Sequence, residues 1–93
     1  MKATKIKMKS GCLNSKSCQE IDSVYIIGCQ SPGYYKKGQL YDYLDAHPDT
    51  ISVDGYPYTY LVGAIGPAPN YEKYVRSSPN DTTADNLLSL PRE

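Results

Sequence analysis

The fold predicted for this chain depends mainly on residues 50 to 62, Thr50-Ile51-Ser52-Val53-Asp54-Gly55-Tyr56-Pro57-Tyr58-Thr59-Tyr60-Leu61-Val62. The dipeptide Asp54-Gly55 suits the positive φ angles of a type I′ hairpin turn. After it, side chains alternate with a period of two residues, which is typical of a strand. Pro57 cannot donate to a ladder of hydrogen bonds and favours an edge position. The stretch therefore predicts a hairpin that places Tyr56, Tyr58 and Tyr60 on one face.

Three further stretches carry strand patterns. Residues 4–9 alternate apolar side chains and threonine with lysines, which indicates a half-buried strand with a lysine outer face. Residues 21–29 contain the continuous apolar run Val24-Tyr25-Ile26-Ile27, which indicates a central strand. Residues 71–77 alternate again and are predicted to form the last strand.

One helix is predicted, over residues 36–46. Leu40 and Leu44 stand four positions apart, and Pro48 ends the pattern because a proline disfavours helical backbone before it. A helix this short is not stable alone and must pack on the sheet. We therefore expect a single α+β domain spanning residues 1–93. Its small antiparallel or mixed sheet of about four to five strands packs on one short helix, with an irregular C-terminal tail.

The aromatic composition is unusual, because the chain has ten tyrosines but neither phenylalanine nor tryptophan. Each tyrosine brings a large ring and a hydroxyl that needs a partner or water. A domain of this size buries only roughly 60% of its unfolded surface. We therefore expect several tyrosines at a surface, an interface or the mouth of a pocket, and we expect oligomerisation to assist the small core.

The charges are unevenly distributed although the net charge is zero. Residues 1–37 carry seven lysines and two acids, whereas residues 38–93 carry three cations and eight acids. This asymmetry suits head-to-tail self-association, although solvated lysines on the outer face of a strand also explain it. The balanced total gives no signature of nucleic-acid or membrane binding, so neither partner is expected.

No catalytic or metal-binding pattern is present in the sequence. Cys12, Cys18 and Cys29 are separated by five and ten residues and form no C-x-x-C pair. With no secretory pattern over residues 1–9, free thiols in the cytoplasm of a bacterium or a phage-infected host are the simplest interpretation. The single histidine, His47, stands at the predicted helix end, where it complements terminal carbonyls. We expect a non-enzymatic protein without a cofactor.

The C-terminal stretch, residues 74–91, contains Tyr-Val-Arg-Ser-Ser-Pro and ends in Asn-Leu-Leu-Ser-Leu-Pro. It resembles the ending Tyr-x-Arg-Ser-x-Pro and Asn-Leu-x-x-Leu-Pro of a family of small bacterial and phage proteins classed as a domain of unknown function. The chain departs from that pattern at Asn80-Asp81, where the family tends to have Asp-Gly. The resemblance implies a small fold of bacterial or phage type and no particular activity.

Arg76 and Asn86 in this tail have two interpretations. In the structural one, the guanidinium of Arg76 binds loop carbonyls, Asp85 or Asn86 caps a terminal turn, and Leu87, Leu88 and Leu90 seal the core. In the functional one, Arg76 reads a phosphate or carboxylate in a pocket, and Asn86 reads the edge of a base.

The tyrosines cluster near cations, which makes them the strongest candidates for binding. Such groups suit protein interfaces and also suit the stacking of nucleobases. We predict a small protein-interaction or inhibitor module of phage type that acts as a homo-oligomer, with a host protein as a further candidate partner. The alternative is a binder or sponge of a small nucleotide-like signalling ligand at an oligomer interface. The candidate binding residues are Tyr34, Tyr35, Lys36, Tyr56, Tyr58, Tyr60, Tyr74, Arg76 and Asn86.

Overall fold

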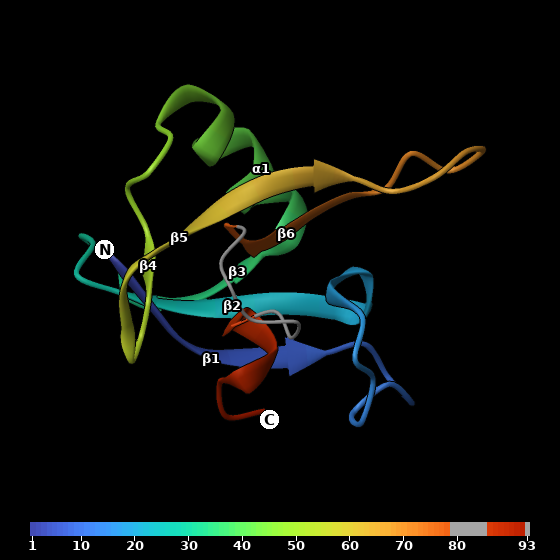
Figure 1. Cartoon of the computed structure of the whole chain (residues 1–93), viewed down its shortest axis with the longest axis horizontal. Coiled ribbons are helices and arrows are strands. Elements are labelled where there is room, and N and C mark those ends of the chain that lie inside the picture. The colour runs from blue at the N-terminus through green and yellow to red at the C-terminus, as the bar shows by residue number, and fades with distance from the viewer. Residues whose placement is uncertain (79–85, 93) are drawn as a thin grey trace.

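The computed structural model of the chain describes residues 1–78 and 86–92, apart from the side chains of Pro57 and Asn86. Its helices and strands confirm a small α+β domain (Figure 1). In chain order they are β1 (Lys2–Met8), the 3-10 helix η1 (Cys18–Glu20), β2 (Ile21–Ile27), β3 (Gly33–Lys36), α1 (Lys37–Ala46), β4 (Ser52–Val53), β5 (Tyr56–Ile65), β6 (Lys73–Ser77) and the 3-10 helix η2 (Asn86–Ser89).

The sheet has six strands in the order β3-β2-β1-β4-β5-β6, so the expectation of four to five strands is wrong. The unexpected strand is β3, four residues that run into α1 without a polar break. The sheet is mixed, because β1 and β4 are parallel and the other pairs are antiparallel. β4 and β5 form the predicted hairpin. A type I′ turn requires a positive φ at both central residues. Gly55 has a φ of 84°, but the φ of Asp54 is not positive, so the turn is not type I′.

β5 belongs to both halves of the sheet. Its first residues pair with β4, and its last five pair with β6. Figure 1 shows β1 and β2 along one side of the molecule and β5 and β6 along the other, with β4 joining them at one end. The two halves enclose the core between their inner faces.

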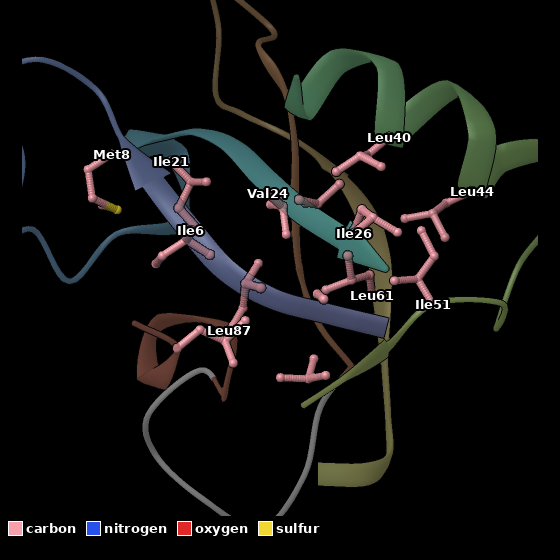
Figure 2. Close-up of a cluster of buried hydrophobic side chains, with 14 residues drawn as sticks. Ile6, Met8, Ile21, Val24, Ile26, Leu40, Leu44, Ile51, Leu61 and Leu87 are labelled. Atoms are coloured by element: carbon pink, nitrogen blue, oxygen red, sulfur yellow. The ribbon is translucent and has the colours of Figure 1, made fainter. Parts of the chain in front are cut away.

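The core is aliphatic. Leu40 and Leu44 of α1 are buried, as the helix pattern predicted. They point toward Ile26 of β2, Ile51 before β4 and Leu61 of β5 (Figure 2). None of the ten tyrosines is fully buried. The rings therefore lie at the margins of the core or on the surface.

The C-terminal end packs back onto the domain, as predicted for residues 86–91. Leu87 and Leu90 are buried in the core. The backbone N–H of Ile6 donates to the carbonyl of Pro91 at 2.9 Å, and Ile6 forms a parallel bridge with Arg92. β4 pairs with β1 only at Lys2 and Ala3. The tail therefore forms a single-residue bridge to the edge of β1 beyond the end of β4.

α1 crosses β5 at a glycine. A Cβ atom built on Gly63 would lie 2.7 Å from Cδ2 of Tyr41, a distance that real Cβ atoms essentially never show. The Tyr41 ring therefore lies directly on the backbone of β5. Nζ of Lys73 on β6 lies 5.3 Å from the centre of the same ring and donates to Asp42 of α1 at 2.9 Å. This close approach positions the helix over β5 and β6.

We predict that Gly63→Ala lowers the free energy of unfolding by about 1–3 kcal/mol, because the new methyl group must displace the Tyr41 ring. Urea denaturation measures this change. Gly38→Ala is the matched control, since a Cβ there meets nothing within 4 Å and the site lies in α1. It should raise the stability by up to about 1 kcal/mol through its higher helix propensity. Equal effects of the two substitutions would contradict the packing described for Tyr41.

Candidate functional site: the outer face of β5 and β6

Tyr58 and Tyr60 of β5 lie on the outer face of the sheet with Tyr74 and Arg76 of β6, because Thr59 between the two rings and Leu61 after them are buried. Tyr56 does not join them, because β5 shifts its register against β4 between Tyr56 and Tyr60, and Tyr56 pairs with the buried Val53. In the register of the hairpin, Val62 lies opposite Arg76 and Ala64 lies opposite Tyr74. We define the β5–β6 tyrosine face as Tyr58, Tyr60, Tyr74 and Arg76.

Tyr60 is placed next to Arg76 by the backbone. Its carbonyl accepts from the N–H of Ser78 at 2.8 Å, and its own N–H donates to Oγ of Ser78 at 3.3 Å. Ser78 is two residues from Arg76, so Tyr60 and Arg76 are diagonal neighbours on the outer face. Diagonal neighbours in an antiparallel pair are within reach of aromatic and long side chains.

The exposure of this face is graded along β5. Tyr58 is 91% exposed, whereas Tyr60, Tyr74 and Arg76 are half-buried. A tyrosine ring that stands almost fully in water leaves a large apolar area to be covered by a partner. The geometry provides rings and one guanidinium for stacking and cation–π contacts.

The predicted residues of β3 lie elsewhere and have separate roles. Tyr34 packs edge-on against Tyr25 of β2, with ring centres 5.0 Å apart. Lys36 donates to Asp22 at 2.9 Å, which lowers the pKa of that carboxyl group. Tyr35 turns to the inner face, where it packs against the core. β3 and β6 stand at opposite ends of the strand order, so the nine candidate residues do not form one face of the sheet.

Arg92 makes a carbonyl clamp of the kind considered for Arg76. Nη1 of Arg92 donates to the carbonyls of Leu13 and Ser15, each at 2.7 Å, and Nη2 donates to the carbonyl of Leu88 at 3.2 Å. These bonds hold the loop after β1 against the C-terminal tail. The side chain of Asn86 lies outside the described residues, as does the Asn80-Asp81 turn. No signal in the sequence favoured Arg92, because its contacts depend on the three-dimensional approach of distant loops.

A second polar cluster surrounds Glu72, just before β6. Its Oε1 accepts from Nζ of Lys9 at 2.8 Å and also from Nζ of Lys37. Nζ of Lys37 donates in addition to the carbonyl of Gln19 at 2.8 Å. The Lys37 side chain is only 13% exposed, so this ammonium group is largely shielded from water. The cluster ties the end of β1, η1 and the start of α1 to the β5–β6 turn.

The lysines and Glu72 perturb one another. The hydrogen bonds from Lys37 and Lys9 lower the pKa of the Glu72 carboxyl group. Burial lowers the pKa of Lys37, whereas the hydrogen bond to Glu72 raises the pKa of Lys9. Partners that are 63 and 35 positions away along the chain explain why sequence patterns did not reveal this cluster. We interpret it as a structural tie between loops.

The remaining candidates for chemistry are dispersed. The three cysteines, all within the described residues, are half-buried and form no disulfide bond. Among residues 1–78 and 86–92 no group of three or more His, Cys, Asp or Glu could hold a metal ion. The His47 ring packs beside Tyr43, with ring centres 4.8 Å apart, and its backbone N–H closes α1. No helix within the described part of the chain is long and apolar enough to span a bilayer.

We predict that Arg92→Ala lowers the free energy of unfolding by about 1–2 kcal/mol, because the carbonyls of Leu13, Ser15 and Leu88 lose a charged donor. Urea denaturation measures the change. Arg92→Lys should recover only part of the loss, since an ammonium group lacks the planar fork that binds several carbonyls together. Lys16→Ala, at an exposed position in the same loop, is the control and should have little effect. Full stability of Arg92→Ala would show that the clamp is dispensable.

The Glu72 cluster makes the free energy of unfolding depend on pH in the acid range. The folded-state pKa of Glu72 is lowered, so its contribution is present above the unfolded-state pKa and is lost as the pH falls through the folded-state pKa. Glu72→Gln should therefore lower the melting temperature at neutral pH and reduce its fall between neutral and acid pH. Thermal melts monitored by circular dichroism test this. Asp45→Asn, an exposed change on α1, is the control. An unchanged acid dependence in Glu72→Gln would contradict the assignment.

Comparison with known proteins gives a family without an assigned activity. The family model described as "Protein of unknown function (DUF3892)" matches residues 2–91. No curated protein and no solved structure matches the chain. The match covers every described helix and strand and the tail that closes the core. The chain therefore belongs to the DUF3892 family of proteins of unknown function.

Proposed function

We propose that this protein is a non-enzymatic interaction module that forms homo-oligomers through the β5–β6 tyrosine face. The observation that supports this most directly is the gathering of three tyrosines and Arg76 on one outer face, with Tyr58 91% exposed. Protein interfaces are enriched in tyrosine and arginine, and a few such residues supply most of the binding energy.

The first occupant of this face is a second copy of the chain. A surface that combines aromatic rings with one guanidinium is complementary to itself, because Arg76 of one copy can stack on a ring of the other. A two-fold interface uses the same patch on both subunits, as such a surface requires. The oligomer then acts as an inhibitor or adaptor on a host protein. The three cysteines form no disulfide bond, which favours a reducing compartment, so we place this activity in the cytoplasm of a bacterium or a phage-infected host.

A second candidate function is the binding of a small nucleotide-like ligand. It is supported by a groove beside Tyr35, one of the tyrosines singled out in the sequence. Arg76 lies on the outer face of β6 and does not line this groove. The ligand would therefore be bound without Arg76, which the sequence suggested as the residue that binds its phosphate.

Tyr58→Ser tests the interaction proposal. We expect sedimentation velocity and native mass spectrometry to show a dimer or higher oligomer for the unmodified chain. Tyr58→Ser should weaken self-association by about 2 kcal/mol or more, as expected for a central aromatic contact. Tyr71→Ser is the matched control, because Tyr71 is 64% exposed but lies in the turn between β5 and β6, outside the face. A strict monomer at the highest soluble concentration would overturn the proposal.

A further inference from the structure

A groove of about 710 Å³ lies where α1 passes the end of β2. Its floor is apolar and is formed by Ile26, Leu40 and Ile51, all of which are buried. Tyr35 of β3 and Tyr43 of α1 also line it. Sites for small molecules usually enclose about 300–1,000 Å³, with mostly apolar and aromatic walls and a few polar groups. The groove has the size and composition of such a site.

The turn after β2 forms one wall and is held in place before any ligand arrives. Gly28 has a φ of 77°, a conformation that side-chain-bearing residues rarely adopt. A Cβ atom there would lie 3.4 Å from the Cα of Met1, so the turn packs closely against the start of β1. The hydroxyl of Tyr35 donates to the carbonyl of Ser31, and burial raises the pKa of this hydroxyl, which keeps it protonated. A wall fixed in this way costs little ordering entropy on binding.

The polar side chains of the groove are uncharged and comprise the amides of Gln30 and Gln39, the thiol of Cys29 and the hydroxyls of Ser31, Tyr35 and Tyr43. The carboxamide oxygen of Gln39 accepts from the backbone N–H of Lys36 at 3.2 Å. This bond orients the side chain and leaves its NH₂ group as a donor. Cys29 is half-buried at the same wall, with Sγ 3.8 Å from the carbonyl of Ile26. Within the described residues, no Lys, Arg, Asp, Glu or His side chain lines the groove.

From these features we infer that the groove binds a neutral, planar heteroaromatic molecule of nucleoside size, held between Tyr35 and Tyr43, that presents a hydrogen-bond acceptor to Gln39. The apolar floor and tyrosine walls suit the faces of a ring system, and stacking on tyrosine is tolerant of the particular base. A phosphate would find no cationic side chain among the lining residues. The inference rests on the second candidate function above, and it assigns recognition to the base and sugar.

The test uses Cys29 as a reporter. In a chain carrying Cys12→Ser and Cys18→Ser, Cys29 is the remaining thiol, and circular dichroism first establishes that this chain is folded. The rate of alkylation by iodoacetamide is measured with adenosine, guanosine, cytidine or uridine, and then with the corresponding 5′-monophosphates. At least one nucleoside should slow alkylation about tenfold when it is present at about ten times its dissociation constant. The monophosphate should bind no more tightly than its nucleoside.

Two variants complete the test. Tyr43→Ser should weaken nucleoside binding by about tenfold or more, equivalent to about 1.4 kcal/mol. Tyr71→Ser, an exposed tyrosine outside the groove, should leave it unchanged. The inference is overturned if no nucleoside protects Cys29, if protection requires the phosphate, or if Tyr43→Ser binds as well as the parent. Because self-association is measured separately with Tyr58→Ser, failure of the groove and failure of the β5–β6 interface are distinguishable.

Discussion

The parallel pairing of Lys2 and Ala3 with Ser52 and Val53 joins the two halves of this sheet. This pairing covers only two residues of each strand, and the arrangement of the helix and the tail follows from its shortness. Beyond it, β1 and β5 are free to separate. The inner faces of both halves are apolar, so other apolar side chains must fill the space between them and exclude water. α1 fills it from one side with Leu40 and Leu44, and the C-terminal tail fills it from the other with Leu87 and Leu90.

Local patterns predicted most of the fold because they are imposed by burial on one face. The period of two residues identified β1 and β5, and the Leu40–Leu44 spacing identified α1 to within one residue of its start. β3 was missed because four residues are too few to show alternation before the helix begins. The last strand begins at Lys73 and not at Tyr71, whose φ of 48° lies outside the extended region. These differences arise where the sequence is short or the backbone is irregular.

The candidate site could be predicted only along single strands. Alternation predicted one face for Tyr56, Tyr58 and Tyr60, but the register shift between β4 and β5 separates Tyr56 from the other two. The position of Tyr60 relative to Tyr74 and Arg76 depends on the register of β5 and β6. That register is set by the turn after Ile65, where the N–H of Gly66 donates to the carbonyl of Glu72 at 2.8 Å. The roles of Arg92 and Glu72 could not be predicted from the sequence for the same reason, because their partners come close only in the folded chain.

The absence of phenylalanine and tryptophan from the sequence gives the tyrosines their importance. Isoleucine, leucine and valine fill most of the interior, so no aromatic ring is needed at its centre. The rings instead line its boundary: Tyr41 on Gly63, Tyr34 against Tyr25, and Tyr35 at the groove. A ring at the boundary stabilises the fold with one side and offers the other to a partner. Tyr58, at 91% exposure, has far less contact with the fold than the half-buried rings. The stability of the domain therefore does not require a large aromatic side chain at that position.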